Sequence, residues 1–325
     1  MIMKTMFSSL VLDLNVEAEA NRIAGAIRTQ VTQQLRRKGV VVGLSGGIDS
    51  TVTAALCVRA LGKERVFGLF MPETDSSPDS LRCGRLVADS LGIRSAVEDI
   101  TPILKAAGCY QRRDEAIRTL VPQFTDRFKA KIVLPDLSEG NRYSIFSIVI
   151  QPPTGKAIKT RLTAEAYRGI VAATNFKQRA RKMMEYYYAD LLGYANAGTC
   201  NRLEHELGFF VKNGDGAADL KPIAHLYKSQ VYQLAAYLNA PEETQRRPTT
   251  TDTYSLEHTQ EEFSFSIPLD KMDLCLFARN HDLPAEDVAE AVGLPAAQVQ
   301  QVYSQIDSKR AVTRYLGMEP LLATP

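Results

Sequence analysis

Residues 39–50 combine residue types and a spacing that suit phosphate binding. They read G-V-V-V-G-L-S-G-G-I-D-S, in which three valines precede two adjacent glycines and then Asp49 and Ser50. Three consecutive β-branched residues predict a strand buried on both faces of a parallel sheet, and the glycines predict a turn into a helix over residues 51–61. Because the first N–H groups of a helix lack intrahelical acceptors, this turn suits an anion such as phosphate.

The turn differs from the Walker loop, because no Lys-Ser or Lys-Thr pair closes it. The hydroxyls of Ser45, Ser50 and Thr51 can donate hydrogen bonds in place of the Walker lysine. Asp49 beside a phosphate would repel it unless a cation lay between them, so this residue indicates Mg²⁺. An ordinary strand-to-helix turn is the alternative, and the full S-G-G-I-D-S string after a valine-rich strand favours phosphate binding.

A second polar stretch covers residues 195–220 and combines Thr199, Glu204 and Lys212 with an acidic glycine loop, N-G-D-G, at 213–216. The loop lacks the regular oxygen ligands and the closing glutamate of an EF-hand, which argues against a calcium site of that kind. Lys228 follows at the predicted start of a helix, where a lysine opposes the helix dipole. This position favours an anionic partner, and an exposed lysine is the simpler alternative.

A cluster of cations occupies residues 175–182, N-F-K-Q-R-A-R-K, inside a predicted helix over residues 164–192. The cluster has two interpretations, an exposed basic helix face or a segment that faces a ligand. Asn175 and Phe176 among the cations favour the second, since arginine suits bidentate binding of oxyanions. The four cations are Lys177, Arg179, Arg181 and Lys182.

Predicted strands and helices alternate along the first half of the chain and must position these residues. The expected helices cover residues 15–37, 80–91 and 109–129, and the expected strands after the first cover 66–71 and 95–100. The charged run at 112–115 is most simply a solvated helix face. This alternation predicts an α/β fold with a doubly wound parallel sheet, whose ligands lie at the carboxyl ends of the strands.

Two segments depart from that alternation. Strand-like runs at 143–151 and 157–162 flank the turn P-P-T-G and predict an inserted β-hairpin, either a dimer contact or a flap. Residues 284–316 predict two short helices, and DNA binding is disfavoured because the second is rich in Gln and Ala. The chain is therefore expected to be one domain over 1–325, with a hairpin insertion at 130–165 and a helical C-terminal segment at 265–325.

Composition limits the class of protein. Lys+Arg 39 against Asp+Glu 37 gives a net charge of +2, so no global basic signal points to nucleic acid. Five scattered cysteines without a C-x-x-C pair argue for a reducing compartment, and no apolar run reaches the length of a membrane span. We expect a cytoplasmic protein that binds neither nucleic acid nor membrane.

Taken together, the motifs resemble the NAD synthetase family, within the N-type ATP pyrophosphatases. The resemblance rests on S-G-G-I-D-S, N-F-K-Q-R-A-R, G-T-x-N-x-x-E, G-F-F-V-K-N-G-D-G-A-A-D-L, P-I-x-x-L-Y-K-S-Q-V and R-P-T, all in the order of that family. It implies a Rossmann-type fold like that of the adenine-nucleotide α-hydrolases, in which the first motif is the pyrophosphate loop, or PP-loop. It covers roughly residues 10–315.

The resemblance also implies roles for individual residues. Asp49 and Lys228 would be catalytic, and Asp49 and Glu204 would ligate Mg²⁺. The residues that would bind ATP are Gly43, Leu44, Ser45, Gly46, Gly47, Ile48, Asp49, Ser50, Thr199, Lys228 and Thr249. Those that would bind deamido-NAD⁺ are Arg179, Lys212, Asp219 and Lys309. Cys200, next to Thr199, is interpreted as a bystander.

The reaction implied by the resemblance is formation of a C–N bond by a ligase. ATP would adenylate deamido-NAD⁺, releasing pyrophosphate, and ammonia would displace AMP to give NAD⁺. The family implies a homodimer with the dinucleotide at the subunit boundary. The residues before the first core helix are too few for a glutaminase domain, which predicts free ammonia as the nitrogen source and leaves a separate glutaminase subunit open.

Three departures from the family pattern leave the acceptor open. Ser308-Lys309 stands where the family has His-Lys, P-T-T-T-D at 248–252 stands where it has P-T-A-D-L, and the hairpin is an addition. One alternative is therefore an amide ligase of the same fold that adenylates a different carboxylate. Another is a nucleotide-binding homologue without catalytic activity.

Overall fold

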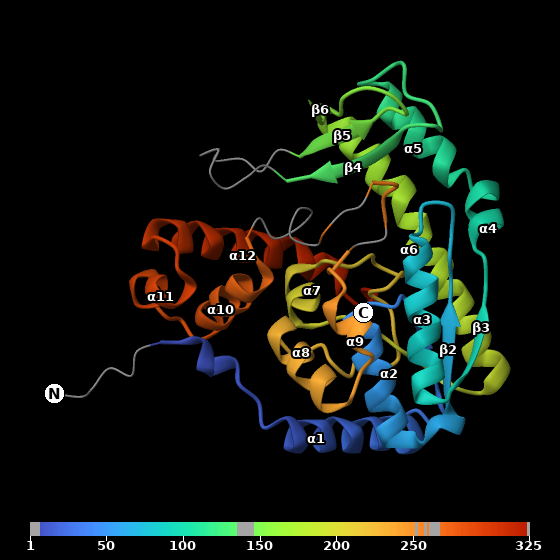
Figure 1. Ribbon diagram of the computed structural model, residues 1–325, viewed down its shortest axis with the longest axis vertical. Helices are drawn as coiled ribbons and strands as arrows, with labels where there is room; N and C mark the ends of the chain where they lie inside the picture. Colours follow the sequence, from blue (N-terminus) through green and yellow to red (C-terminus); the bar gives the residue numbers. More distant parts are fainter. Residues whose placement is uncertain (1–6, 135–145, 251–252, 257–258, 260–266, 324–325) are drawn as a thin grey trace.

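The central element of the fold is a parallel sheet of four strands in the order β3-β2-β1-β7 (Figure 1). The computed structural model describes residues 7–134, 146–250, 253–256, 259 and 267–323. The four strands are β1 (Val40–Gly43), β2 (Val66–Phe70), β3 (Arg94–Val97) and β7 (Ala195–Ala197). Each neighbouring pair runs parallel, which confirms the predicted α/β class.

Helices cover both faces of this sheet. They are α1 (Val16–Thr29), α2 (Ile48–Leu61), α3 (Pro78–Leu91), α4 (Thr101–Ala106), α6 (Ala164–Leu192) and α8 (Lys228–Tyr237). Val40 and Val42 pack in one core with α1, α2, α3 and α8. Val41 and Leu69 pack in another with α4 and α6. Successive valines point to opposite faces because of the strand pleat, so the three-valine run is buried on both sides, as a doubly wound sheet requires.

Short elements complete this part of the chain. They are the π-helical turn η2 (Gln30–Gln34), the 3₁₀ turn η3 (Lys63–Arg65), α7 (Arg202–Leu207) and α9 (Glu242–Arg246). The predicted helix over 15–37 is formed by α1 and η2 together. The α2 helix begins at Ile48, three residues before the predicted start, because the second glycine of the loop is its N-cap.

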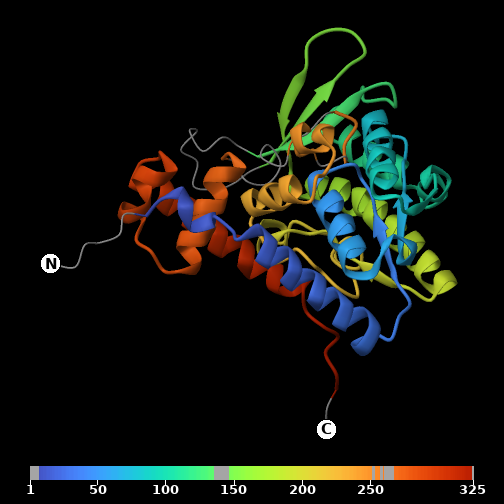
Figure 2. The same ribbon diagram turned by 60° about the horizontal axis from the view of Figure 1, so that its bottom comes forward.

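A second sheet of three antiparallel strands lies beyond one end of the parallel sheet and projects from the body of the molecule (Figure 2). Its strands are β4 (Lys129–Val133), β5 (Ser147–Gln151) and β6 (Ile158–Arg161). The hairpin β5–β6 matches the predicted one, except that residues 143–145 of the expected first strand lie outside the described residues. Its inner face packs on α5 (Cys109–Arg118) and the start of α6.

The predicted helix over 109–129 is wrong in its second half. The α5 helix ends at Arg118, and β4 begins at Lys129. The strand reads K-A-K-I-V, and its alternation buries Ala130 and Ile132 against the cluster beneath the sheet. Only Lys129 of this strand lay in the predicted helix, and residues 119–128 form turns, where Pro122 prevents α5 from continuing.

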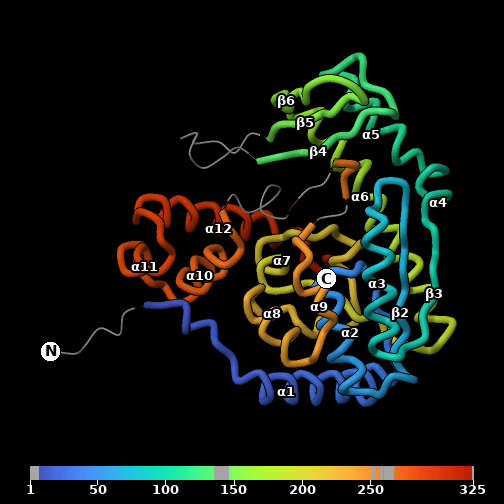
Figure 3. The backbone as a smooth tube through the Cα atoms, in the orientation of Figure 1, coloured from blue at the N-terminus to red at the C-terminus, as the bar shows by residue number. Residues whose placement is uncertain are grey.

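The C-terminal helices form their own hydrophobic cluster beside the sheet. They are α10 (Leu269–Asn280), α11 (Ala285–Val292) and α12 (Ala296–Leu316). The cluster also takes in the N-terminal turn η1 (Ser9–Leu12) and α7, so the N-terminal turn packs on the C-terminal helices before α1 runs along the sheet (Figure 3). The α12 helix has 21 residues, longer than the short helix expected. In the described part of the chain no helix is long and apolar enough to cross a membrane.

The buried centre of the parallel sheet predicts a large effect of truncation on stability. Leu69 is fully buried in β2, so Leu69→Ala should lower the free energy of unfolding by about 2–5 kcal/mol through lost contacts and a cavity. Val97→Ala on edge strand β3 is the control, because Val97 is 42% exposed and its loss should cost less than about 0.5 kcal/mol. Urea denaturation measures both, and equal losses would contradict this packing.

Candidate active site

The loops that follow β1, β2 and β7 meet at one edge of the parallel sheet. Gly43 at the end of β1 is paired with Leu69 of β2, and Val42 is paired with Ala197 of β7. The loop at 44–47 and Thr199 therefore leave the sheet from adjacent strands in the same direction. This places two predicted ATP-binding segments side by side, at the edge where α/β sheets bind ligands.

The glycine loop is held in one shape by its packing on α3. Gly46 has a φ of +73°, and a Cβ built there would lie 2.7 Å from both Cys83 Cβ and Ser80 O. Only glycine satisfies both constraints. Gly47 is the N-cap of α2, and its N–H donates to Ser45 Oγ at 3.2 Å. The first N–H groups of α2 therefore face outward from a fixed turn, as an anion site requires.

Residues of the loop offer different groups to a ligand. Leu44 and Ile48 are buried in the core, so they can contribute only backbone groups. The hydroxyls of Ser50 and Thr51 both donate to Gly47 O at 2.9 Å and stabilise the first turn of α2. Ser45 is the exposed hydroxyl of the loop.

Lys228 and Asp49 form a buried ion pair directly behind this loop. Lys228 is the first residue of α8, its exposed fraction is 2%, and its Nζ pairs with Asp49 Oδ2. Burial lowers the pKa of Lys228, but the negative charges of Asp49 and Glu204 outweigh it and the net pKa is raised. The lysine is therefore a permanent cation. Asn201 Nδ2 donates to the other oxygen of Asp49 at 3.2 Å and fixes the carboxylate.

A carboxylate of α10 compensates for a lysine at the positive end of α8. Asp273 Oδ1 accepts the N–H of Lys228 at 3.1 Å, and Asp273 Oδ2 accepts the N–H of Ser229 at 2.7 Å. Asp273 thus supplies the helix cap that the sequence immediately before Lys228 lacks. Sequence reasoning missed Asp273 because it lies 45 positions away.

Glu204 completes this group of charges. It lies in the first turn of α7, where its Oε2 accepts the N–H of Asn201 and its own N–H donates to Asn201 Oδ1, both at 3.1 Å. Burial raises the pKa of Glu204 to about 8, and the nearby charge of Asp49 adds to the effect. Two carboxylates that repel each other at the mouth of an anion site are a donor pair that suits a divalent cation.

Asp49 and Glu204 could hold Mg²⁺ only together with a phosphate. Across the described residues, no group of three or more His, Cys, Asp or Glu side chains could hold a metal. Mg²⁺ in proteins is commonly bound by one or two carboxylates together with water and substrate phosphates. Asp49 and Glu204 meet that requirement.

The segment at 247–250 lies over the loop. Arg247 donates from Nη1 to Ser45 O at 3.2 Å and from Nη2 to Ser80 Oγ at 2.7 Å, which ties the segment to the glycine loop and to α3. Thr249, a predicted ATP contact, is two residues further on and half-buried. Sequence reasoning missed Arg247, for which the run R-R-P-T was the available signal.

Three of the four predicted acceptor residues, Arg179, Lys212 and Asp219, lie on or beside α6. Arg179 Nε donates to Lys212 O at 3.3 Å, and Lys212 Nζ donates to Tyr315 O at 3.0 Å. Asp219 Oδ2 accepts the N–H of Asn196 at 2.7 Å. Lys309, on α12, is half-buried, and burial lowers its pKa to about 8. Arg179, Lys212 and Asp219 thus lie near the acidic N-G-D-G loop at 213–216. Lys309 lies on α12, the helix whose Tyr315 O accepts a hydrogen bond from Lys212.

The predicted cation patch at 175–182 is wrong for two of its four members. Lys177 and Lys182 are buried and ion-paired, and only Arg179 is exposed. Lys182 Nζ donates to Glu185 Oε2 at 2.5 Å and to Asn196 Oδ1 at 2.7 Å. Lys177 faces inward because carboxylates of the loop after β2 meet it, and Lys182 because Glu185 of the same helix and Asn196 of β7 accept its protons.

The predicted solvated face at 112–115 is also wrong for Arg113 and Asp114. Arg113 Nε pairs with Asp114 Oδ1 at 2.8 Å, and both side chains are largely buried. Elsewhere at the site, Cys200 is buried, and burial raises the pKa of its thiol to about 12. It is a thiol and not a thiolate at neutral pH, in line with its interpretation as a bystander.

Comparison with known proteins gives a consistent result. The family model described as NAD synthase matches residues 19–135 and 136–313. The chain is 57% identical over 322 residues to the NH(3)-dependent NAD(+) synthetase of Rhizobium meliloti, covering 99% of this chain and 96% of that one.

Two solved structures share the fold. One is the NH3-dependent NAD synthetase from Campylobacter jejuni, with a TM-score of 0.63 and 23% identity over 96% of this chain and all of that one. The other is an NMN synthetase from Francisella tularensis, with a TM-score of 0.60 and 21% identity over 96% of this chain and 99% of that one. At these identities the likeness concerns the fold.

The raised pKa of Glu204 predicts a pH dependence of stability in the absence of divalent cations. The carboxyl has a reference pKa of 4.5 and a folded-state pKa of about 8, so the folded protein keeps a proton that the unfolded chain loses between these values. Stability therefore falls as pH rises through this window. Glu204→Gln removes this loss and should raise the free energy of unfolding at pH 8 by about 1–2 kcal/mol, reduced from the full linkage value by access of water.

Glu206→Gln is the matched control on the same helix. Burial opposes ionisation of Glu206, but hydrogen bonds from Arg310 and Arg202 outweigh it and its pKa is lowered. This variant should therefore lose stability at pH 8, in urea denaturation with a chelator present. A loss in both variants would contradict the assignment of Glu204.

Proposed function

Because this chain belongs to the NAD synthase family, whose members form C–N bonds, we propose that it converts deamido-NAD⁺ to NAD⁺ with ATP and ammonia. The observation that carries the proposal is the buried pair of Lys228 and Asp49, with Glu204 beside it, behind a glycine loop shaped for an anion. Near-full-length similarity to an NH(3)-dependent synthetase supports the same reaction.

The first step is adenylation of the acceptor. A carboxylate oxygen of the nicotinate group attacks the α-phosphorus of ATP, an O–P bond forms, and the bond from that phosphorus to the bridging oxygen breaks. Pyrophosphate leaves with the bonding electrons, and the product is an acyl-adenylate. Negative charge grows on the leaving phosphates, and the loop N–H groups and Lys228 would stabilise it.

The second step is attack of ammonia on the activated carbonyl. A C–N bond forms, the bond from carbon to the AMP oxygen breaks, and the nitrogen gives up one proton to become the amide. No side-chain nucleophile is needed, which agrees with the protonated thiol of Cys200.

Mg²⁺ would be held by Asp49 and Glu204 and would supply positive charge to the ATP phosphates. In the ligand-free protein Lys228 supplies the positive charge between these carboxylates. The ATP phosphates would contact residues 43–50, and Thr199, Lys228 and Thr249 would complete the ATP site.

Arg179, Lys212, Asp219 and Lys309 would bind the dinucleotide acceptor. The three cations suit its two phosphate groups, and Asp219 is already fixed by a hydrogen bond from the backbone of β7. The five cysteines are all unpaired and buried, which supports a reducing, cytoplasmic location. The ammonia would come from solution or from a separate glutaminase.

We also propose that two copies associate through α6. Met183, Tyr187 and Leu191 are spaced four residues apart, so they share one face of the helix, and they are 52%, 55% and 64% exposed. An apolar stripe on a charged protein marks an interface, and α6 also carries Arg179. A second copy seated there would bring the acceptor residues of both chains close to the subunit boundary.

Asp49→Asn tests the proposed reaction. It should lower kcat by about 100-fold or more, because the charge group that meets the phosphates loses its central carboxylate. The measurement is pyrophosphate release and NAD⁺ formation from Mg-ATP and ammonium, with and without deamido-NAD⁺. Asp79→Asn, an exposed acid in the first turn of α3, is the control and should keep wild-type rates.

The same assay distinguishes the alternatives. If deamido-NAD⁺ is inert while another carboxylate elicits pyrophosphate release, the protein is an amide ligase with a different acceptor. If Asp49→Asn leaves acceptor-dependent release intact, the catalytic role of this charge group is wrong.

Tyr187→Glu tests the interface. A charge in the middle of the apolar stripe should shift the protein from twice the chain mass of 36.0 kDa to that mass itself, measured by light scattering at micromolar concentration. Leu86→Glu, at an apolar residue 37% exposed on α3, which packs on the other face of the sheet, should leave the mass unchanged. A wild-type protein that is already monomeric would refute this interface.

A further inference from the structure

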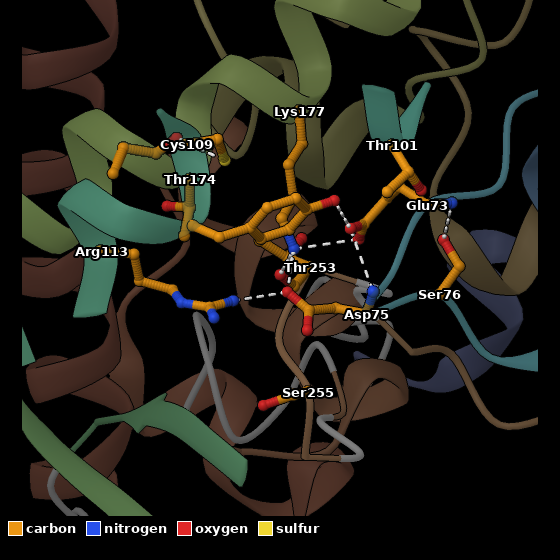
Figure 4. Close-up of polar contacts among 12 residues, drawn as sticks. Glu73, Asp75, Ser76, Thr101, Cys109, Arg113, Thr174, Lys177, Thr253 and Ser255 are labelled. Atoms are coloured by element: carbon orange, nitrogen blue, oxygen red, sulfur yellow. Dashed lines mark hydrogen bonds and ion pairs between the residues drawn. The ribbon is translucent and has the colours of Figure 1, made fainter. Parts of the chain in front are cut away.

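Lys177 is a buried lysine that joins three segments far apart in the chain. It is fully buried on α6, and its Nζ donates to Glu73 Oε1 at 2.9 Å, to Asp75 Oδ2 at 2.6 Å and to Thr253 O at 2.8 Å (Figure 4). All three protons of the ammonium are thus used. Two go to the loop after β2, and the third goes to a backbone carbonyl from the C-terminal half of the chain.

The two carboxylates do not depend on Lys177 alone. Arg113 Nη1 pairs with Asp75 Oδ2 at 2.5 Å (Figure 4). Tyr110 OH donates to Glu73 Oε2 at 2.7 Å. Glu73 also accepts the N–H of Asp75 at 3.0 Å. A buried lysine needs compensating negative charge, and this group supplies it. The hydrogen bond from Lys177 to Thr253 O does not balance any charge. Its effect is to fix the position of Thr253.

The loop after β2 is fixed to α6 at a second point. Arg181 Nε donates to Met71 O at 3.3 Å, one helical turn from Lys177. Pro72 O accepts the N–H of Ile100 at 3.1 Å. This loop leaves the sheet at the edge that carries the PP-loop, so Lys177 holds Thr253 against a rigid part of the ATP side of the site.

Residues 253–256, which we call the anchor segment, are also fixed to the three-stranded sheet. Tyr254 is 6% exposed and packs in the cluster beneath that sheet. Ser255 Oγ accepts the N–H of Ala130 at 2.9 Å, and the N–H of Leu256 donates to Ala130 O at 3.3 Å. The anchor segment therefore has three kinds of attachment, to α6, to β4 and to the core between them.

The anchor segment is close in sequence to the residues over the PP-loop. Arg247 is bonded to Ser45 and Ser80, and Thr249 follows it. Residues 251–252 lie outside the described part of the chain, but three residues of chain span at most about 11 Å, so Thr253 cannot be far from Thr250. Fixing Thr253 therefore restricts where Arg247 and Thr249 can lie.

We propose that Lys177 is a positioning residue for ATP, which acts by holding the anchor segment so that Arg247 and Thr249 stay over the PP-loop. The three-stranded sheet supports the anchor segment through two hydrogen bonds to Ala130 and through the packing of Tyr254 in the cluster beneath the sheet. This inference rests on the proposed function for its kinetic consequence. It assigns the inserted sheet a role in nucleotide binding within one chain.

The test uses two variants that loosen the anchor segment in different ways. Tyr254→Ala removes its apolar contact. Glu73→Gln/Lys177→Met removes the bond to Thr253 and one carboxylate charge together, so that Asp75 keeps Arg113 and no buried charge is left unpaired. Val121→Ala is the control, because Val121 belongs to the same cluster but to a different segment.

Steady-state kinetics provides the first readout. Both loosening variants should raise KM for ATP about tenfold, with a change in KM for deamido-NAD⁺ and in kcat below about threefold. Val121→Ala should keep the wild-type KM for ATP, and Tyr254→Phe, which retains the ring, should recover most of the affinity lost in Tyr254→Ala. An unchanged KM for ATP in both loosening variants, with only a lowered thermal midpoint as in Val121→Ala, would overturn the proposal.

Limited trypsin digestion of the ligand-free protein provides a readout independent of the reaction. The bond between Arg246 and Arg247 should be cut several-fold faster in the two loosening variants than in wild type and Val121→Ala, because Arg247 is released from Ser45 and Ser80. Equal cutting rates would overturn the anchor. If wild-type protein fails to convert deamido-NAD⁺ while the variants are cut faster, the proposed function is wrong and the anchor remains supported.

Discussion

The buried ion pair between Lys228 and Asp49 is the interaction on which the rest of the site depends. A lysine with 2% exposure is tolerated only beside negative charge, which Asp49 supplies, and that same charge, added to burial, raises the pKa of Glu204 to about 8. Asp273 holds the backbone of Lys228 from the C-terminal helices. The loop at 44–47, α7, α8 and α10 are therefore brought into one geometry by the ammonium of Lys228, and a phosphate-bound cation would favour ionisation of Glu204 beside Asp49.

Local patterns made much of the sheet and the loop predictable. Three valines followed by Gly46 and Gly47 specify a buried strand and a turn with positive φ, because each requirement is met within a few residues. The pair of Asp49 and Lys228 was reached through its family resemblance, and the structure gives it a physical reason. Their side chains meet across 179 positions, a distance over which composition and periodicity carry no information.

The burial of some charged side chains could not be predicted from the sequence, because it depends on contacts formed only in the folded protein. Lys177 belongs to a run of cations that composition assigns to a surface, yet it is buried because acids from a distant loop meet it. Glu73 lies 104 positions from Lys177. The free energy that offsets the burial of Lys177 therefore comes from contacts that are distant in sequence. The helix predicted over 109–129 was too long, because α5 ends at Arg118, ahead of Pro122.

The central claim is that the site adenylates the carboxylate of its acceptor, and transfer of an oxygen isotope tests it most directly. Deamido-NAD⁺ labelled with ¹⁸O in the nicotinate carboxylate would be turned over with Mg-ATP and ammonium, and the AMP and pyrophosphate examined by mass spectrometry. Attack of the carboxylate on the α-phosphorus leaves one labelled oxygen on AMP and none on pyrophosphate. Label in inorganic phosphate or pyrophosphate, or NAD⁺ formed with unlabelled AMP, would contradict the account.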